Sequence, residues 1–449
     1  MPNAHACGLR LLAKNFCRTP EELRVNSQIL VCRFFGCEPD SRYDFAPFTL
    51  LTENSDGQFA NGRPSPEELA LMPPRAIVLS LDQLSRRCLS CYGHEWIETP
   101  TLDRLASRGV VFDHCFSSPA PAEEMRDAAR RLCEQLTSHG VRVQRLCEPE
   151  ANDTDELSKT PFAQLMTGAE IAVTKMSRDT AAPWLLWLES SGIGWPDVAT
   201  SQFVELYADE LEDDDVPAEL ASLREMEIMY AALLTQFDHL LGRLLATLEQ
   251  LFGEDLPLLV IVAAHGQGVC EAEMLSPFTD RFAELSAEAG SLRDELVHVP
   301  LLALNATSES LGSRRSELVT PADVLLTLSD WFGDPQQTAG GAASLLPLLR
   351  NENVAWRSEV FLQDDEGHAA VRTERFLLVQ PDAAVQLAAT RSADEVANDV
   401  TSWLFLKPED VWEVNNVAGQ HPDQVATLRG ALRVWLPAAD STSAVGGAG

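Results

Sequence analysis

A run of six mostly apolar residues, AIVLSL at 76–81, constrains the fold of this chain more than any other feature. The run has the length of a strand and no polar face, which is typical of a strand that is buried on both sides of a sheet. Two similar runs occur in PWLLWLE at 183–189 and LPLLVIVAAHGQG at 256–268, with helical periodicity between them. This alternation predicts an α/β fold with a mostly parallel sheet sandwiched by helices.

Other segments predict the remaining elements and the domain boundaries. PTLDRLASRGVVF predicts a short helix ending near Gly109 and then a strand, and residues 224–252 predict a long amphipathic helix. Near the C-terminus, EVFLQ, AAVRT and FLLVQ predict short antiparallel strands, and HPDQVATLRGALRVWL predicts a closing helix. The expected divisions are a poorly ordered N-terminal extension, an α/β domain, a smaller C-terminal α+β subdomain and a disordered tail, at 1–72, 73–355, 356–437 and 438–449. The extension is either an over-extended start or a small embellishment packed on the domain.

Charge and composition exclude some partners. The 449 residues include 68 acidic and 34 basic ones, a formal net charge of −34, so nucleic acid and anionic membranes are not expected to bind. No apolar run is long enough to span a bilayer, and the N-terminus shows no signal-peptide core. Ten scattered cysteines are a low density for a disulfide scaffold in so long a chain. A cytoplasmic protein with mostly reduced thiols is the expectation.

Two polar residues follow strands of the predicted sheet. Asp82 comes directly after AIVLSL, and His265 closes the run in LPLLVIVAAH. In sheets of this kind, sites form at the carboxyl ends of the strands. We therefore expect Asp82 and His265 to be neighbours in space.

The segment VLSLDQLSRRCLSCYGHEWIETPTLDRLASRGVVFDHCFS resembles the N-terminal signature of the sulfatase family, within the alkaline phosphatase superfamily. YAALLTQFDHLLGRLLATLE, LVIVAAHGQG, LRDELVHVPLLAL, TPADVLLTLSDWFG, AVRTERFLLV and LFLKPEDVWEVNNVA resemble later family segments, in the family's order. The resemblance runs from about 75 to 436. It implies the sulfatase fold, a hard divalent cation, usually calcium, and a formylglycine nucleophile made from a Cys/Ser-x-Pro-x-Arg motif.

This chain departs from the family pattern at the cation. Asp82 matches the first metal-binding Asp, and the next position is Gln83, which offers an amide oxygen without charge. The Asp expected before the family's late His-Gly is Ala264, so His265 stands without its carboxylate neighbour. Asp82 and His265 are thus interpreted as a vestigial metal site, although a strand-end histidine bonded to a backbone carbonyl explains His265 equally.

The nucleophile is missing as well. The family motif would fall in SSPAPAEEMRDAARRLCEQL, which has no Cys or Ser from Pro119 through Arg131. Arg126 is a candidate replacement for the family's arginine, and Lys175 is the best-placed candidate for the lysine that clamps the sulfate. The segment SSGIGWP lacks the family's loop histidine. A group that attacks and a group that assists the leaving group are both needed for hydrolysis of this kind.

Three functions remain open. The favoured one is a degenerate sulfatase-like protein, a pseudoenzyme that binds or regulates a partner, with no cofactor. The alternative is an active metal-dependent hydrolase of sulfate or phosphate esters with relocated site residues, using calcium or magnesium. The third is a metal-free structural or interaction subunit. The sequence does not identify the partner, and a protein is the candidate kind.

Overall fold

The computed structural model describes residues 23–25, 28–30, 52–53, 59–60, 73–118, 122–150, 154–179, 181–193, 199–208, 221–266, 292–304, 312–334, 341–381 and 402–443. The chain divides into two units, Met1–Leu71 and Met72–Gly449. In the first unit, β1 (Leu23–Val25) pairs with β2 (Gln28–Leu30), and β3 (Thr52–Glu53) pairs with β4 (Phe59–Ala60), both antiparallel. The expected poor order of the N-terminal extension otherwise concerns residues outside the described ones.

The second unit contains a seven-stranded main sheet with the order β11-β6-β10-β9-β5-β8-β7. Its strands are β5 (Arg75–Leu81), β6 (Val110–Phe116), β7 (Arg142–Cys147), β8 (Trp184–Ser190), β9 (Leu258–Ala263), β10 (His298–Leu304) and β11 (Ser313–Val319). Only β10 runs antiparallel to its neighbours, β6 and β9, among these strands. The prediction of a mostly parallel sheet is confirmed.

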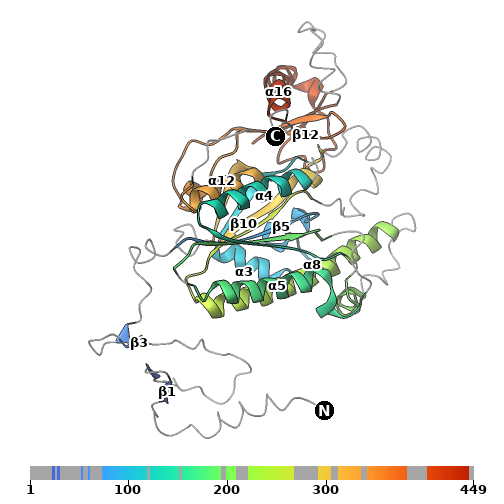
Figure 1. Cartoon of the computed structure of the whole chain (residues 1–449). Helices are drawn as coiled ribbons and strands as arrows, with labels where there is room; N and C mark the ends of the chain where they lie inside the picture. Colours follow the sequence, from blue (N-terminus) through green and yellow to red (C-terminus); the bar gives the residue numbers. More distant parts are fainter. Residues whose placement is uncertain are drawn as a thin grey trace. The chain divides into compact units, whose positions relative to one another are not determined.

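Helices cover both faces of this sheet (Figure 1). α3 (Pro100–Arg108), α5 (Pro161–Met176) and α8 (Ala221–Phe252) lie on one face, and α4 (Ala122–Ser138) and α12 (Pro321–Trp331) lie on the other. The predicted long helix is α8, whose buried stripe includes Phe237, Leu240, Leu241, Leu244 and Leu248. Burying each of these side chains stabilises the fold by roughly 1.5–3 kcal/mol. Shorter elements are η1 (Arg86–Cys88), η2 (Ser90–Tyr92), η3 (Leu157–Lys159), α6 (Ser201–Val204), η4 (Glu205–Tyr207), α11 (Asp294–Val297), α13 (Leu346–Leu349) and η7 (Ala418–Gln420).

The ends of α3 show why a helix forms where the sequence predicted one. The Asp238 carboxylate on α8 accepts the backbone N–H groups of Thr101 and Leu102, each at 2.9 Å, and so satisfies two donors of the first turn. The helix stops before Gly109, where a Cβ would lie 2.6 Å from the Ala303 carbonyl oxygen of β10. Only glycine allows so close an approach of the two backbones.

A second, antiparallel sheet of four strands has the order β12-β13-β14-β15. Its strands are β12 (Glu359–Gln363), β13 (Ala369–Thr373), β14 (Phe376–Gln380) and β15 (Trp403–Leu406). One face packs on Phe116, Val297 and Leu318 of the main domain, and the other packs on α16 (Pro422–Ser443). The predicted smaller C-terminal subdomain is thereby confirmed in its antiparallel architecture.

The end of α16 differs from the expected disordered tail at 438–449. The helix continues through Ser443, and residues 444–449 lie outside the described ones. Extending an established helix costs little per residue, which is why composition alone placed the boundary too early. Across the described ranges, no helix is both long and apolar enough to cross a membrane.

Candidate functional site

Three neighbouring strands of the main sheet end together. Leu81 of β5 pairs with Ala263 of β9 and with Ser190 of β8. Asp82 and Ala264 follow, and the Ala264 backbone N–H donates to the Leu81 carbonyl at 2.7 Å. We call this side of the sheet, where β5, β8 and β9 end, the carboxyl edge.

Asp82 lies at the centre of the carboxyl edge. Its side chain is 11% exposed and forms an ion pair with the Arg126 guanidinium of α4, which is 41% exposed. Burial raises the pKa of Asp82 above its ordinary value, and the charges of Arg126 and His265 oppose that rise. The structure thus brings together Asp82, Arg126 and His265, three residues that the sequence singled out.

The backbone around Asp82 is held closely on two sides. Gly192 has a φ of +109°, and a Cβ there would lie 1.9 Å from the Asp82 carbonyl oxygen. That oxygen also accepts the Ile193 backbone N–H at 3.2 Å. Gln83 takes the left-handed region with a φ of 59°, and its carbonyl accepts the Tyr230 hydroxyl at 3.1 Å. The Asp82–Gln83 turn is therefore fixed by its neighbours rather than free to rearrange.

His265 follows Ala264 and is half-buried. Its Nδ1 lies 3.0 Å from the Gly266 carbonyl, which can only accept, so Nδ1 carries the proton. This is the backbone-bonded arrangement that the sequence left open for a strand-end histidine.

Ser117 and Ser118, which precede the segment where the nucleophile motif would fall, each form a hydrogen bond within the fold. The Ser117 hydroxyl donates to the Ala264 carbonyl, and the Ser118 hydroxyl oxygen accepts the Gln363 backbone N–H at 3.2 Å. Ser117 therefore joins β6 to the residue beside His265, and Ser118 joins β6 to the C-terminal sheet. Residues 119–121 lie outside the described ones.

Glu189, near the carboxyl end of β8, was not predicted as a site residue from the sequence. Its Oε1 accepts the Arg145 guanidinium at 2.6 Å, and its Oε2 accepts the Cys147 thiol at 3.2 Å. The charge of Glu189 contributes to the raised pKa of Asp82, so the two carboxylates share one region. The available signal was a single acidic residue at the carboxyl end of an apolar strand, the same pattern as Asp82 itself.

Lys175 does not lie at the carboxyl edge. It is exposed near the end of α5, directly before Met176, whose carbonyl accepts the Arg142 guanidinium at 2.7 Å. Arg142 begins β7, so Lys175 lies at the opposite edge of the sheet. The interpretation of Lys175 as a residue of the cleft is corrected, because a helix that precedes a parallel strand ends where that strand begins.

The described residues do not fit the calcium site that the family resemblance implies. Calcium takes six to eight oxygen ligands and depends on carboxylate charge. At the carboxyl edge, Asp82 is paired with Arg126, Glu189 is paired with Arg145, and Ala264 offers no side-chain ligand. Guanidinium groups hold the positions beside both carboxylates, so a divalent cation would meet like charge there.

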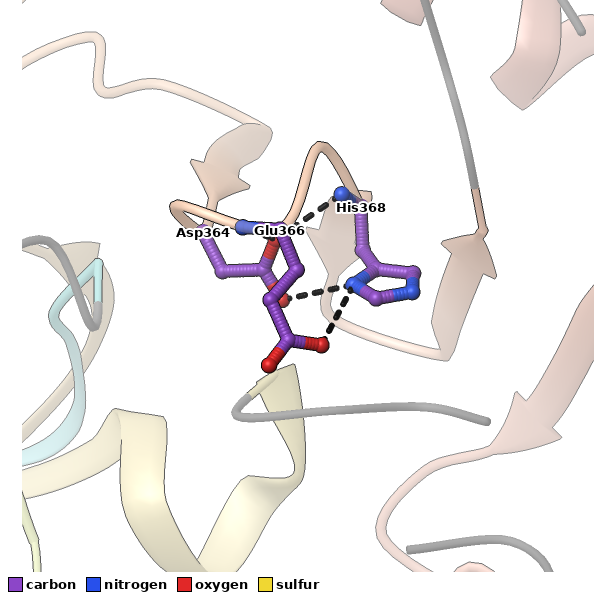
Figure 2. Close-up of side chains that lie close together, drawn as sticks. All are labelled: Asp364, Glu366 and His368. Carbon is purple, nitrogen blue, oxygen red and sulfur yellow. Dashed lines mark hydrogen bonds and ion pairs between the residues drawn. The ribbon is translucent and has the colours of Figure 1, made fainter. Parts of the chain in front are cut away.

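A second polar cluster occurs on the turn between β12 and β13 (Figure 2). Asp364, Glu366 and His368 place one ligand atom each within 4.8 Å of the others. Asp364 accepts the backbone N–H groups of Glu366 at 3.0 Å and His368 at 2.8 Å, and its other oxygen lies 2.9 Å from His368 Nδ1. These bonds are those of an Asp-capped turn, which accounts for the cluster without a ligand.

No protein-family model matches the sequence. Among curated proteins, the chain is 26% identical over 145 residues to the multifunctional alkaline phosphatase superfamily protein PehA of Trinickia caryophylli, covering 32% of this chain and 26% of that protein. It is 34% identical over 53 residues to an N-acetylglucosamine-6-O-sulfatase of Bacteroides thetaiotaomicron, covering 12% of this chain and 10% of the sulfatase. These sequence matches span no more than about a quarter of the relatives' length.

The solved structures extend the likeness over most of the chain. A protein solved in complex with its substrate D-glucosamine-2-N,6-O-disulfate matches 82% of this chain and 98% of its own with a TM-score of 0.63, at 16% identity. The chain has the sulfatase fold. The phosphonate monoester hydrolase of Agrobacterium radiobacter shares this fold, with a TM-score of 0.58 over 82% of this chain and 96% of the hydrolase, at 16% identity. The resemblance to sulfatases in the alkaline phosphatase superfamily is confirmed for the fold.

Proposed function

We propose that this sulfatase-fold protein binds or regulates a partner and does not hydrolyse sulfate or phosphate esters. The observation that carries the proposal is the ion pair between Arg126 and Asp82. Asp82 stands where the resemblance implies a metal-binding carboxylate, and a guanidinium neutralises it there. The fold is thereby kept while the cation chemistry is lost.

Electrostatics supports this proposal. A divalent cation beside Asp82 would meet the positive charge of Arg126 at short range, in a site where Asp82 is mostly removed from water. Ala264 supplies no compensating carboxylate. Hard cations bind weakly where ligand charge and ligand number are low.

The nucleophile motif that the resemblance implies is missing from the sequence. Nucleophilic hydrolysis needs an oxygen or sulfur aimed at the ester and a neighbour that activates it. The sequence from Pro119 to Arg131 contains no Cys or Ser, and the hydroxyl of Ser117, just before this segment, donates to the Ala264 carbonyl. A binding role needs none of these groups.

We also propose that the protein is cytoplasmic and that its partner is a protein. Cys91, Cys115, Cys133 and Cys147 are free thiols in the described part of the chain. Thiols in this number are typical of a reducing compartment. The acidic surplus of the chain favours a partner other than nucleic acid.

The first test measures cation binding and turnover in the purified full chain. We expect calcium and magnesium to bind no better than weakly by calorimetry, and aryl sulfates and aryl phosphates to react no faster than in buffer. Turnover that is proportional to protein, requires a divalent ion and disappears in Asp82→Ala would establish the alternative, an active metal-dependent hydrolase.

A second test restores what the site lacks. The double variant Arg126→Ala, Ala264→Asp removes the competing guanidinium and adds a carboxylate beside Asp82, so its calcium affinity should rise by about tenfold or more. The matched control is Arg130→Ala, which removes an exposed arginine on the same helix that pairs with Asp127. Equal calcium binding by the wild type and the double variant would remove the role given to Arg126.

A further inference from the structure

His298, the first residue of β10, lies between two groups that accept hydrogen bonds. Its Nδ1 lies 3.2 Å from Asp294 Oδ2, and its Nε2 lies 2.6 Å from the Asp113 backbone carbonyl oxygen. The ring stacks on that of Phe116, with the two centroids 4.4 Å apart. The side chain is 8% exposed, so water has little access to either nitrogen.

Asp294 is ionised at neutral pH. Burial raises its pKa, but the charges of Lys407, His298 and Arg87 together hold the pKa well below its ordinary value. Lys407 Nζ lies 3.7 Å from Asp294 Oδ1, and Arg87 Nη2 lies 3.8 Å from Asp294 Oδ2. The carboxylate therefore has no proton to give to His298.

The two bonds of His298 require two N–H groups. A neutral imidazole has one N–H and one lone pair, whereas an imidazolium has two N–H groups. Burial lowers the pKa of His298 to about 4, against the charge of Asp294 and the bond to Asp113 that raise it, and a pKa of that size would make the ring neutral at pH 7. The geometry contradicts a neutral ring, because one ring nitrogen would then face Asp294 Oδ2 or the Asp113 carbonyl as acceptor against acceptor at hydrogen-bonding distance. Such a contact is costly where water has little access.

Charged and titratable side chains of several elements lie around His298 and Asp294 or act on their partners. They are Arg86 and Arg87 of η1, Asp113 and His114 of β6, Arg293 and Glu295 beside Asp294, and Arg372, Glu374, Lys407 and Glu413 of the C-terminal subdomain. Among the charges that act on His298, Asp294 favours the imidazolium more strongly than Arg86 disfavours it. These two charges together therefore support a proton on both ring nitrogens.

The segment that holds Asp294 joins two parts of the second unit. The Asp294 backbone N–H donates to Glu413 Oε1 at 3.1 Å, and the same carboxylate oxygen accepts Lys407 Nζ at 2.9 Å. Two residues further on, the Leu296 carbonyl accepts the Gly266 backbone N–H at 2.7 Å, beside His265. The helix α11 thus connects the C-terminal subdomain to the carboxyl edge, and the bonds of His298 attach it to β6.

We propose that His298 is an imidazolium at neutral pH and that its proton makes α11 a pH-sensitive link between the C-terminal subdomain and the carboxyl edge. With the proton in place, Asp294 and the Asp113 carbonyl each accept an N–H of the ring. When the proton is released to solvent at higher pH, Nδ1 and Asp294 Oδ2 become two acceptors that repel each other, and α11 loosens. This link does not depend on whether the carboxyl edge hydrolyses an ester or binds a partner.

Nitrogen-15 NMR of the full chain with labelled histidine tests the protonation state directly. The signals of His298 are identified by their loss in His298→Gln. We expect both ring nitrogens of His298 to be protonated at about pH 7.5, where a histidine with the ordinary pKa of about 6.5 is about nine-tenths neutral. If His298→Gln does not fold, Asp294→Asn identifies the signals, because loss of the carboxylate should lower the pH at which His298 releases its proton by about one unit or more. One protonated and one unprotonated ring nitrogen in the wild type at this pH would overturn the proposal.

Amide hydrogen exchange between about pH 6.5 and about pH 9 tests the link. A group whose pKa is raised in the folded state stabilises that state fully below the unfolded pKa of about 6.5, and this stability is lost as the pH rises through the folded pKa. The amides of residues 264–266 and 294–298, corrected for the intrinsic pH dependence of exchange, should therefore lose about tenfold in protection over this range in the wild type.

Two variants locate the effect. His298→Gln should remove this pH-dependent loss of protection. His114→Gln is the matched control, since His114 is the neighbouring histidine on β6 and its Nδ1 bonds the Ser316 carbonyl at 2.8 Å, so its response should equal that of the wild type. A response in His298→Gln equal to that of the wild type, or protection that falls as the pH drops below about 6.5, would contradict the proposal.

Discussion

Asp82 and Asp323 are two buried carboxylates of the second unit that differ in the groups bonded to them. Burial raises the pKa of both, and each pairs with an arginine, Asp82 with Arg126 and Asp323 with Arg357. Asp323 is fully buried at the start of α12 and accepts the backbone N–H groups of Thr320 and Ala343, each at 2.7 Å. For Asp82, the described side-chain bond is the one from a half-exposed arginine.

This difference separates a carboxylate that supports the fold from one that lies at the carboxyl edge. Backbone donors and a half-buried arginine make Asp323 part of the architecture that caps α12 and holds the chain near Ala343. Asp82 is held in place mainly through its backbone, by the Gly192 and Ile193 loop, while its carboxylate faces a partner that water reaches.

The largest expected effect is the loss of stability when Asp323 is replaced. Asp323→Ala leaves the half-buried Arg357 without its partner and two backbone N–H groups without their acceptor, and it should lower the free energy of unfolding by about 3–5 kcal/mol. Asp82→Ala should lower it by no more than about 1 kcal/mol, because Arg126 can turn toward water. Urea denaturation followed by tryptophan fluorescence measures both. Equal losses in the two variants would contradict the distinction drawn between Asp323 and Asp82.

A smaller effect concerns the backbone that holds Asp82. Gly192→Ala should lower the free energy of unfolding by about 2–3 kcal/mol, since its φ is unfavourable for alanine and its Cβ would contact the Asp82 carbonyl. Gly253→Ala is the control, because Gly253 also has a positive φ, of +61°, but no atom within 4 Å of its Cβ position. The same denaturation experiment should show the larger loss for Gly192→Ala. A larger loss of stability for Gly253→Ala would contradict this prediction, because it would show that the Gly192 loop rearranges without lowering stability.

The smallest effect is the pH dependence of stability that Asp82 contributes. Its pKa is higher in the folded state than in the unfolded state, so the folded state binds the proton more tightly between these two values. The wild type should therefore lose stability, relative to Asp82→Asn, as the pH rises from the unfolded pKa of about 4 through the folded pKa. Denaturation midpoints measured for both proteins at a series of pH values check this. A difference that stays constant with pH would show that the folded pKa is not raised.

The sequence predicted the parts of this structure that local patterns specify. Continuous apolar runs identified β5, β8 and β9, and helical periodicity identified α8. The part of the site at the strand ends was predictable, because β5 and β9 are neighbours and the residues that follow them lie close together. This is why Asp82 and His265 lie together.

The remaining site residues depend on three-dimensional facts that spacing does not contain. Lys175 was chosen by its proximity in sequence, but the direction of α5 carries it to the far edge of the sheet. Glu189 and Arg145 meet because β7 and β8 pair in parallel, which neither segment indicates by itself. The partner of Asp82 was predicted only as a candidate, since the position of Arg126 depends on how α4 begins.

The reversed direction of β10 gives this molecule a second source of residues for its carboxyl edge. β10 runs against β6 and β9, so its first residue, His298, and the short helix α11 before it lie at the edge where the parallel strands finish. The Gly266 backbone N–H donates to the Leu296 carbonyl at 2.7 Å, which ties that incoming segment to the residue after His265. Substitutions upstream of a strand can thus alter the electrostatic field of the edge while every strand-terminal residue stays the same. In such a fold, ligand preference can evolve along one segment of sequence while the scaffold and its remaining loops are conserved.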